Sequence, residues 1–281
     1  MLWSCLAAIV ARLPFGSLRL PGALLGSFVA CVLRIRRSHA IAALRRARIP
    51  RPSSVVAGVY RSLATNVFEL LWMSGRPSAP LDPWVGIDPN DWSRLEACLA
   101  KGRGLVVASA HCGNWDLIAC TMANRAPLSV VTRHMSWRSA NAFWMKSRAS
   151  RRVRLVEPHE TIHAASHVLR SGGVVAFMID QAPERRHGVV QHPFLGAPAW
   201  HDTTFSVVAM RCRSPIAVIV GLREPDGRHR LRLLDVIDPP SSRSTAWVRQ
   251  ACERASGAVD RFVRENPAQW LWLHRRWKDL P

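Results

Sequence analysis

A histidine and an aspartate five residues apart, His111 and Asp116, are the residues of this chain best suited to acid–base chemistry. A neutral imidazole can take a proton from an attacking hydroxyl. A carboxylate that is hydrogen-bonded to the other ring nitrogen fixes the tautomer and stabilises the imidazolium that forms. We therefore expect His111 to be the general base and Asp116 to orient it. A histidine that only caps the following helix is the alternative for a single His-x4-Asp pair.

The segment around this pair predicts a strand followed by a helix. Residues 105–108 are apolar after Gly104, which indicates a buried strand, and residues 114–123 can form a helix. The histidine would then lie at the carboxyl end of a strand, the edge at which open α/β sheets bind ligands. We expect backbone N–H groups near Gly113 and Asn114 to stabilise an oxyanion there. The chain has no G-x-S-x-G motif, so no covalent acyl-serine is expected.

Two further segments, taken together with His111 and Asp116, resemble a known family. Asp180-Gln181 follows an apolar run, and the tail of the chain carries Pro267-Ala-Gln-Trp-Leu-Trp-Leu-His-Arg-Arg-Trp-Lys278. In this order the segments resemble the late acyltransferases of lipid A biosynthesis, part of the lysophospholipid acyltransferase-like superfamily. That family carries H-x4-D/E, a D-Q pair and a closing P-E-Q-Y-L-W-x-H-R-R-[FW]-K. The resemblance extends from about residue 36 to the last residue.

The resemblance implies a glycerophosphate-acyltransferase-like fold and a membrane-associated O-acyltransferase whose donor is an acyl-acyl-carrier-protein. The implied acceptor is a hydroxyl of a phosphorylated Kdo-bearing lipid A precursor, which would attack the thioester directly, without a covalent acyl-enzyme. The resemblance also implies no metal and no soluble cofactor, and an enzyme at the cytoplasmic face of the bacterial inner membrane. Another glycolipid or phospholipid acceptor, such as a mannosylated phosphoinositide, is the alternative.

Several residues near the predicted strand ends are candidates for binding the substrate. The resemblance implies that Arg133 helps to hold the phosphorylated acceptor. Arg148 and Arg185 are further candidates, because the guanidinium fork matches phosphate oxygens bidentately, although each could be an ordinary surface arginine. Asp180 and Gln181 end an apolar strand, so we expect them at the catalytic edge of the sheet as a binding or structural pair.

Beyond this centre, strand patterns alternate with helix patterns. The alternation indicates an α/β fold with a central, mostly parallel sheet flanked by helices. We expect an N-terminal apolar and basic helical region that associates with membranes over residues 1–52, and an acyltransferase domain over residues 53–281. Residues 183–200 are expected to form a long loop. Its apolar side chains, among them Phe194 and Leu195, would either line an acyl groove or pack the loop down.

The charge and the N-terminal segment both favour a membrane surface. The 281 residues carry a formal net charge of +20, and this surplus implies an anionic partner. We expect an anionic membrane with its lipid acceptor and an acidic carrier protein, and no nucleic acid. The apolar runs at 1–10 and 20–33 are each shorter than the roughly 20 residues of a spanning helix, which favours a hairpin or interfacial anchor. A buried core helix is the alternative.

A competing motif is His159-Glu160-Thr-Ile-His163, which has the H-E-x-x-H form of zinc proteases. Against a zinc site, Pro158 would place His159 in the first turn of its helix, where a ligand would lie at a fraying end. We expect no metal here and keep a zinc-dependent hydrolase as the less favoured alternative. A non-enzymatic basic protein would explain the charge but not the ordered motifs. The scattered cysteines indicate reduced thiols in a cytoplasmic protein.

Overall fold

A computed structural model describes residues 2–132, 136–157, 161–184 and 187–278. Its helices are α1 (Leu2–Val10), α2 (Arg19–Phe28), α3 (Arg37–Arg46), α4 (Pro52–Gly75), α5 (Pro89–Leu99), α6 (Trp115–Ala123), α7 (Arg138–Ser150), α8 (Thr161–Arg170), α9 (Thr204–Cys212) and α10 (Thr245–Glu265). Its strands are β1 (Val85–Ile87), β2 (Leu105–Ser109), β3 (Leu128–Val131), β4 (Arg154–Val156), β5 (Val174–Met178), β6 (Val189–Phe194), β7 (Ala197–Asp202), β8 (Ile216–Arg223) and β9 (His229–Ile237).

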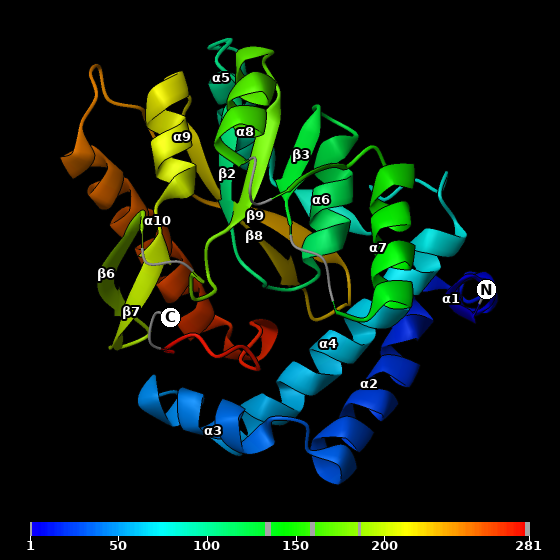
Figure 1. Ribbon diagram of the computed structural model, residues 1–281. Coiled ribbons are helices and arrows are strands. Elements are labelled where there is room, and N and C mark those ends of the chain that lie inside the picture. The colour runs from blue at the N-terminus through cyan, green and yellow to red at the C-terminus, as the bar shows by residue number, and fades with distance from the viewer. Residues whose placement is uncertain (1, 133–135, 158–160, 185–186, 279–281) are drawn as a thin grey trace.

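A seven-stranded sheet with the order β1-β9-β8-β2-β5-β3-β4 forms the centre of the molecule. All of its neighbouring strands are parallel except β8 and β9, which form an antiparallel pair. Helices cover both faces of the sheet (Figure 1). The expected α/β class with a mostly parallel sheet and flanking helices is therefore confirmed.

Strand β2 lies inside the sheet and is buried on both faces. Its side chains alternate between two cores, as the pleat requires. Val106 and Ala108 belong to the core formed with α8, α9 and α10, whereas Leu105 and Val107 belong to the core formed with α5 and α6. The continuous apolar run that predicted this strand therefore reflects burial on both sides. The strand ends at Ser109, two residues before His111.

The N-terminal segment packs against the long helix α4. At Gly22 and Gly26 of α2 the two helices are so close that an added Cβ would lie 2.6 Å from Thr65 Cα and 2.5 Å from Arg61 Cα. The outer side of α2 carries exposed apolar side chains, which include Leu20, Leu24 and Phe28. This helix runs along the lower side of the molecule, together with α3 (Figure 1).

The apolar stretch around α2 is longer than the sequence pattern indicated. A helical stretch of 19 residues, Phe15–Leu33, is long and apolar enough to cross a membrane by length and composition. Pro21 lies in the first turn of α2, directly after a short 3₁₀ helix over Phe15–Leu18, so its missing N–H falls where the α-helical hydrogen bonds begin. The break between α1 and this stretch falls before Phe15.

Residues 183–200 were expected to form a long loop, and this expectation is wrong for most of them. Strands β6 and β7 pair as an antiparallel hairpin, joined by Leu195 and Gly196. Both joining residues have positive φ, 50° and 80°, as a two-residue hairpin turn requires. Phe194 and Leu195 are 1% and 0% exposed, so of the two alternatives they pack down and do not line a groove.

Candidate active site

His111 lies just beyond the carboxyl end of β2, where its ring contacts a carboxylate from the neighbouring strand. Its Nδ1 atom is 2.9 Å from Oδ1 of Asp180, and its backbone N–H donates to Oδ2 of the same group at 2.9 Å. The parallel register explains the contact, because Ser109 of β2 lies beside Met178 of β5 and the two site residues each follow two positions later. The structure therefore pairs the imidazole with Asp180 and not with Asp116.

Asp116 is instead directed toward α7. Its Oδ1 accepts a hydrogen bond from Arg148 Nε at 2.7 Å and another from Trp144 Nε1 at 3.0 Å. Asp116 and Arg148 form a buried ion pair, with side chains 5% and 9% exposed. In the first turn of α6 it is the preceding residue, Trp115, whose ring packs against the His111 ring, with centroids 5.0 Å apart. The expected contact between His111 and Asp116 is therefore corrected to an ion pair between Asp116 and Arg148.

The Asp180 carboxylate is held in its ionised form. Burial raises its pKa, but the charge of His111, the hydrogen bonds from its ring and backbone, and the bond from Trp270 outweigh burial and lower the pKa to about 2. Trp270 Nε1 lies 2.8 Å from Oδ2. An ionised carboxylate can only accept, so His111 must present Nδ1–H to it. The Nε2 atom then carries the lone pair that can take a proton.

His111 borders a cavity of about 1530 Å³ and keeps 17% of its side chain exposed. Two predicted substrate-binding residues, Gln181 and Arg148, line the same cavity. The Gln181 side chain forms no hydrogen bond with a described residue. Arg148 is fixed by Asp116 and by a bond of 3.2 Å to Thr132. The cavity thus offers an amide donor and a guanidinium beside the imidazole, and both can approach an anionic group.

The backbone N–H groups expected to stabilise an oxyanion do not border this cavity. The Gly113 N–H donates to the Gln269 carbonyl at 3.0 Å, and neither Gly113 nor Asn114 is among the cavity residues. Asn114 is buried, and its Oδ1 caps α6 by accepting from the Leu117 N–H. With a φ of 55° at Gly113, the turn directs its amide toward the C-terminal segment. The expected oxyanion site is therefore not supported, and a donor must come from elsewhere in the cavity.

Several other predicted site residues lie outside the described part of the chain. These are the phosphate-binding candidates Arg133 and Arg185 and the first two members of the H-E-x-x-H motif, His159 and Glu160. The third member, His163, is an exposed residue of α8 that lines the cavity. The roles expected for Arg133 and Arg185 stay predictions.

A buried polar network lies behind the His111 turn, and Glu69 of α4 is its centre. The Glu69 carboxylate accepts from the Arg223 guanidinium and from Asn114 Nδ2 at 2.8 Å, and it contacts His229 Nε2 at 3.1 Å. Burial raises the Glu69 pKa, but the charges and hydrogen bonds of His229 and Arg223 outweigh burial and lower the pKa to about 2. None of these residues lines the cavity, so the network supports the turn from outside it.

The network also joins the turn to the C-terminal segment. The Arg223 N–H donates to Gln269 Oε1 at 2.6 Å, and Asn66 Nδ2 donates to the Gly113 carbonyl at 2.6 Å. The prediction from the sequence did not include Glu69 in the site. A carboxylate inside the apolar face of a long helix was the signal that it needs buried cationic partners.

Among the described residues, one cluster of side chains, distant from His111 in the sequence, could offer ligands to a metal ion. The ligand atoms of His192, His201 and Cys252 lie within 4.8 Å of one another. However, the Arg276 guanidinium contacts the His201 ring at 3.0 Å, and burial raises the Cys252 pKa to about 12, which keeps the thiol protonated. A fixed cation and a protonated thiol both oppose a metal ion, so these residues do not fit a metal site.

Comparison with known proteins identifies the family of this chain. The family model described as bacterial lipid A biosynthesis acyltransferase matches residues 2–279 of the chain. No curated protein matches it. Because the family match spans essentially the whole chain, the resemblance found in the motifs is confirmed. The chain belongs to the bacterial lipid A biosynthesis acyltransferase family and is an enzyme that transfers acyl groups.

Proposed function

We propose that the enzyme transfers a fatty acyl chain from an acyl-acyl-carrier-protein to a hydroxyl of a phosphorylated, Kdo-bearing lipid A precursor, with His111 and Asp180 as the catalytic pair. The observation that carries this proposal is the contact of 2.9 Å between His111 Nδ1 and Asp180 Oδ1 at the border of a large cavity. It replaces the pair first expected, since Asp116 already neutralises Arg148.

In the proposed reaction, His111 Nε2 removes the proton of the acceptor hydroxyl while Asp180 stabilises the imidazolium. The acceptor oxygen attacks the thioester carbonyl carbon and a new C–O bond forms. The tetrahedral intermediate then expels the carrier's sulfur as the C–S bond breaks. The imidazolium returns its proton to the departing thiolate, so the products are the acylated lipid and the free thiol. No acyl-enzyme is formed at any point.

The developing oxyanion needs a donor within the cavity. Gln181 is our candidate, because it follows Asp180 directly in the chain, lines the cavity and has no described side-chain partner. A donor that is already oriented before the reaction stabilises the intermediate more effectively than water does. Arg148 would approach a phosphate of the acceptor, and Arg133 and Arg185 stay further candidates for that role.

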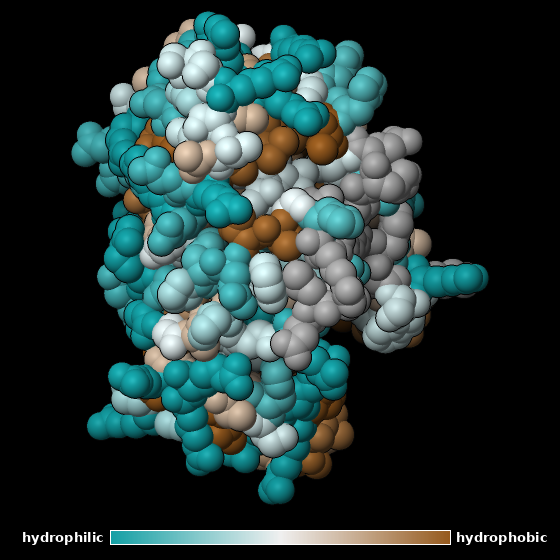
Figure 2. Space-filling model, turned by 60° about the vertical axis from the view of Figure 1, so that its left-hand side comes forward, coloured by the Kyte–Doolittle hydropathy of each residue, from teal (hydrophilic) through white to brown (hydrophobic). Residues whose placement is uncertain are grey.

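The exposed apolar face of α2 supports binding to the cytoplasmic face of the inner membrane. Figure 2 shows apolar surface at the lower end of the molecule, where the N-terminal helices lie in Figure 1. Basic side chains follow the apolar stretch directly, at Arg34, Arg36 and Arg37, where they could contact anionic headgroups. A membrane-bound acceptor could then reach His111 from that side.

Purified enzyme should be assayed with labelled acyl-carrier-protein and a panel of acceptors, in the presence and absence of a chelator. We expect transfer to the phosphorylated Kdo-bearing precursor, loss of transfer in His111→Ala, and no effect of the chelator. Transfer only to a mannosylated phosphoinositide or another glycolipid would keep the chemistry and change the acceptor. Inhibition by the chelator, or full activity of His111→Ala, would contradict the proposed mechanism.

A further inference from the structure

The cavity at His111 extends along α8 to the opposite edge of the sheet. Residues of α8 line it from the first turn, at Thr161, to the last residue, Arg170. The end of α8 lies beside the start of β2, because a Cβ added at Gly104 would be 2.8 Å from Leu169 Cα. Since His111 follows the end of β2, the cavity spans the sheet from its catalytic edge to its other edge.

Three exposed arginines line the far end of this cavity. We call Arg170 of α8, Arg211 of α9 and Arg243 in the loop before α10 the distal arginine cluster. None of them forms an ion pair with a residue that the structure describes. Other arginines of the chain do, for example Arg254, which binds the Asp235 carboxylate through two nitrogens. An unneutralised cluster of guanidinium groups at the end of a cavity favours a phosphate ligand and opposes an acyl chain.

The length of the cavity matches one phosphate-bearing part of the donor. The ten residues of α8 span about 15 Å at the rise of an α-helix. The 4′-phosphopantetheine arm of a carrier protein has a thioester at one end and a phosphodiester at the other. Its extended backbone is equivalent to roughly four residues of extended chain, about 14 Å. An arm whose thioester lies at His111 would therefore bring its phosphate to the distal arginine cluster.

The position of the cluster favours a soluble donor over a lipid phosphate. In Figure 1 the C-terminal ends of α8 and α9 point to the top of the molecule, whereas α2 and α3 lie at the bottom. The distal arginine cluster thus lies on the side away from the exposed apolar face of α2. A lipid headgroup held at that face would be on the wrong side, and an acidic carrier protein in solution could reach the cluster directly.

We propose that this cavity binds the 4′-phosphopantetheine arm of the acyl donor, with its phosphate on Arg170, Arg211 and Arg243 and the carrier protein docked over the ends of α8 and α9. This inference rests on the proposed function and names how the donor enters. Donor and acceptor then reach His111 from opposite sides, and neither has to leave before the other can bind.

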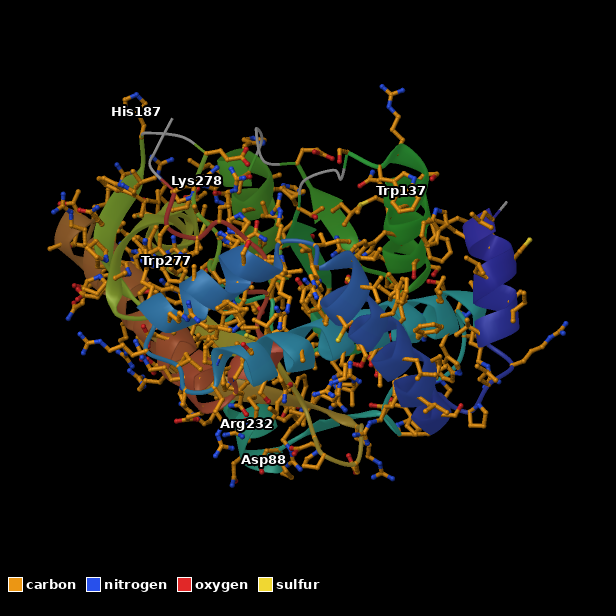
Figure 3. All side chains as sticks on the ribbon, turned by 90° about the horizontal axis from the view of Figure 1, so that it is seen from below. Asp88, Trp137, His187, Arg232, Trp277 and Lys278 are labelled. Carbon is orange, nitrogen blue, oxygen red and sulfur yellow. The ribbon has the colours of Figure 1, made fainter. Side chains whose placement is uncertain are left out.

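The test compares three acyl donors: acyl-carrier-protein, acyl-4′-phosphopantetheine and acyl-pantetheine, which lacks the phosphate. The variant replaces all three arginines, Arg170→Glu, Arg211→Glu and Arg243→Glu. The control is Arg232→Glu. Arg232, labelled in Figure 3, is an exposed arginine of β9 that does not line the cavity and has no described ion pair. We expect the KM for both phosphorylated donors to rise about tenfold or more in the triple variant, and to stay within twofold in the control.

The KM for acyl-pantetheine should stay within twofold in every variant, because that donor has no phosphate to lose. Equal KM values of the wild-type enzyme for acyl-phosphopantetheine and acyl-pantetheine would overturn the inference. The inference would also be overturned if the triple variant raised only the KM for the acceptor, because the cluster would then bind the lipid phosphate. Calorimetry of the binding of unacylated 4′-phosphopantetheine and pantetheine separates this inference from the proposed function. A wild-type protein that prefers phosphopantetheine over pantetheine but transfers no acyl group would support the binding site and contradict the reaction.

Discussion

The imidazole of His111 and the carboxylate of Asp180 face each other from the ends of two neighbouring parallel strands, 2.9 Å apart. Asparagine at position 180 keeps the shape of the side chain but removes the charge that stabilises the imidazolium. We therefore expect Asp180→Asn to lower kcat by about a thousandfold or more, with little change in the KM of the donor. Steady-state kinetics on the membrane-bound or detergent-solubilised enzyme would measure this effect.

Asp116→Asn is the matched control for that substitution. In the wild type the Asp116 carboxylate neutralises Arg148 and does not contact the imidazole. We therefore expect Asp116→Asn to lose thermal stability, to change the KM for the phosphorylated acceptor and to lower kcat by about tenfold or less. If Asp116→Asn lost as much kcat as His111→Ala while Asp180→Asn remained active, the catalytic pair would be His111 and Asp116 after all.

The turn after His111 offers a second prediction, because Gly113 has no room for a side chain. Its φ is 55°, and an added Cβ would lie 2.7 Å from the Gly221 carbonyl oxygen. Gly113→Ala should therefore displace the turn, lower the free energy of unfolding by about 1–3 kcal/mol and reduce kcat. Chemical denaturation and the transfer assay would be measured on the same preparation.

Gly172→Ala separates the two causes of that loss. Gly172 also has a positive φ, 79°, but nothing lies within 4 Å of an added Cβ. This variant should show only the cost of the backbone conformation, about 1 kcal/mol, with unchanged kcat. Equal effects of the two substitutions on kcat would mean that the close contact at Gly113 does not position the catalytic histidine.

The sheet and the place of His111 at its edge could be predicted from the sequence, because apolar runs and breaks are local signals. The partner of His111 could not, because Asp180 lies 69 residues away in the chain and becomes its neighbour only through the pairing of β2 with β5. Asp116 was the nearer acid in sequence. The hairpin turn was missed for a local reason, since Leu195 adopts a positive φ that its residue type does not indicate.

The depressed pKa of Glu69 predicts a stabilising effect that depends on pH. The folded-state pKa lies near 2, below the value of 4.5 for an unperturbed glutamate, so this carboxylate stabilises the fold above about pH 4.5. The contribution is lost as the pH falls toward 2, and it amounts to about 3 kcal/mol. Urea denaturation between pH 6 and pH 3 should show a gap between wild type and Glu69→Gln that shrinks as the pH falls.

Glu96→Gln is the control for this titration, because Glu96 is an exposed glutamate of α5 with no described ion pair. Its unfolding curve should follow that of the wild type at every pH. Asp180 is present in all of these proteins, so its own titration cancels in the comparison. A gap between wild type and Glu69→Gln that stays constant with pH would show that the Glu69 carboxylate does not titrate below its usual range in the folded protein.

The outer face of α2 leads to the final prediction, which concerns the membrane. Leu20, Leu24 and Phe28 are 68%, 65% and 50% exposed, so replacing them removes little packing within the protein. The triple variant Leu20→Ser, Leu24→Ser and Phe28→Ser should keep its melting temperature. It should lose about 1 kcal/mol of membrane binding per side chain, and its partition into anionic vesicles should fall about a hundredfold.

Vesicle flotation would measure the partition. In detergent micelles, where the acceptor is dispersed, kcat should equal that of the wild type, since none of the three side chains lines the cavity at His111. Unchanged partition would mean that this apolar face does not hold the enzyme on the membrane.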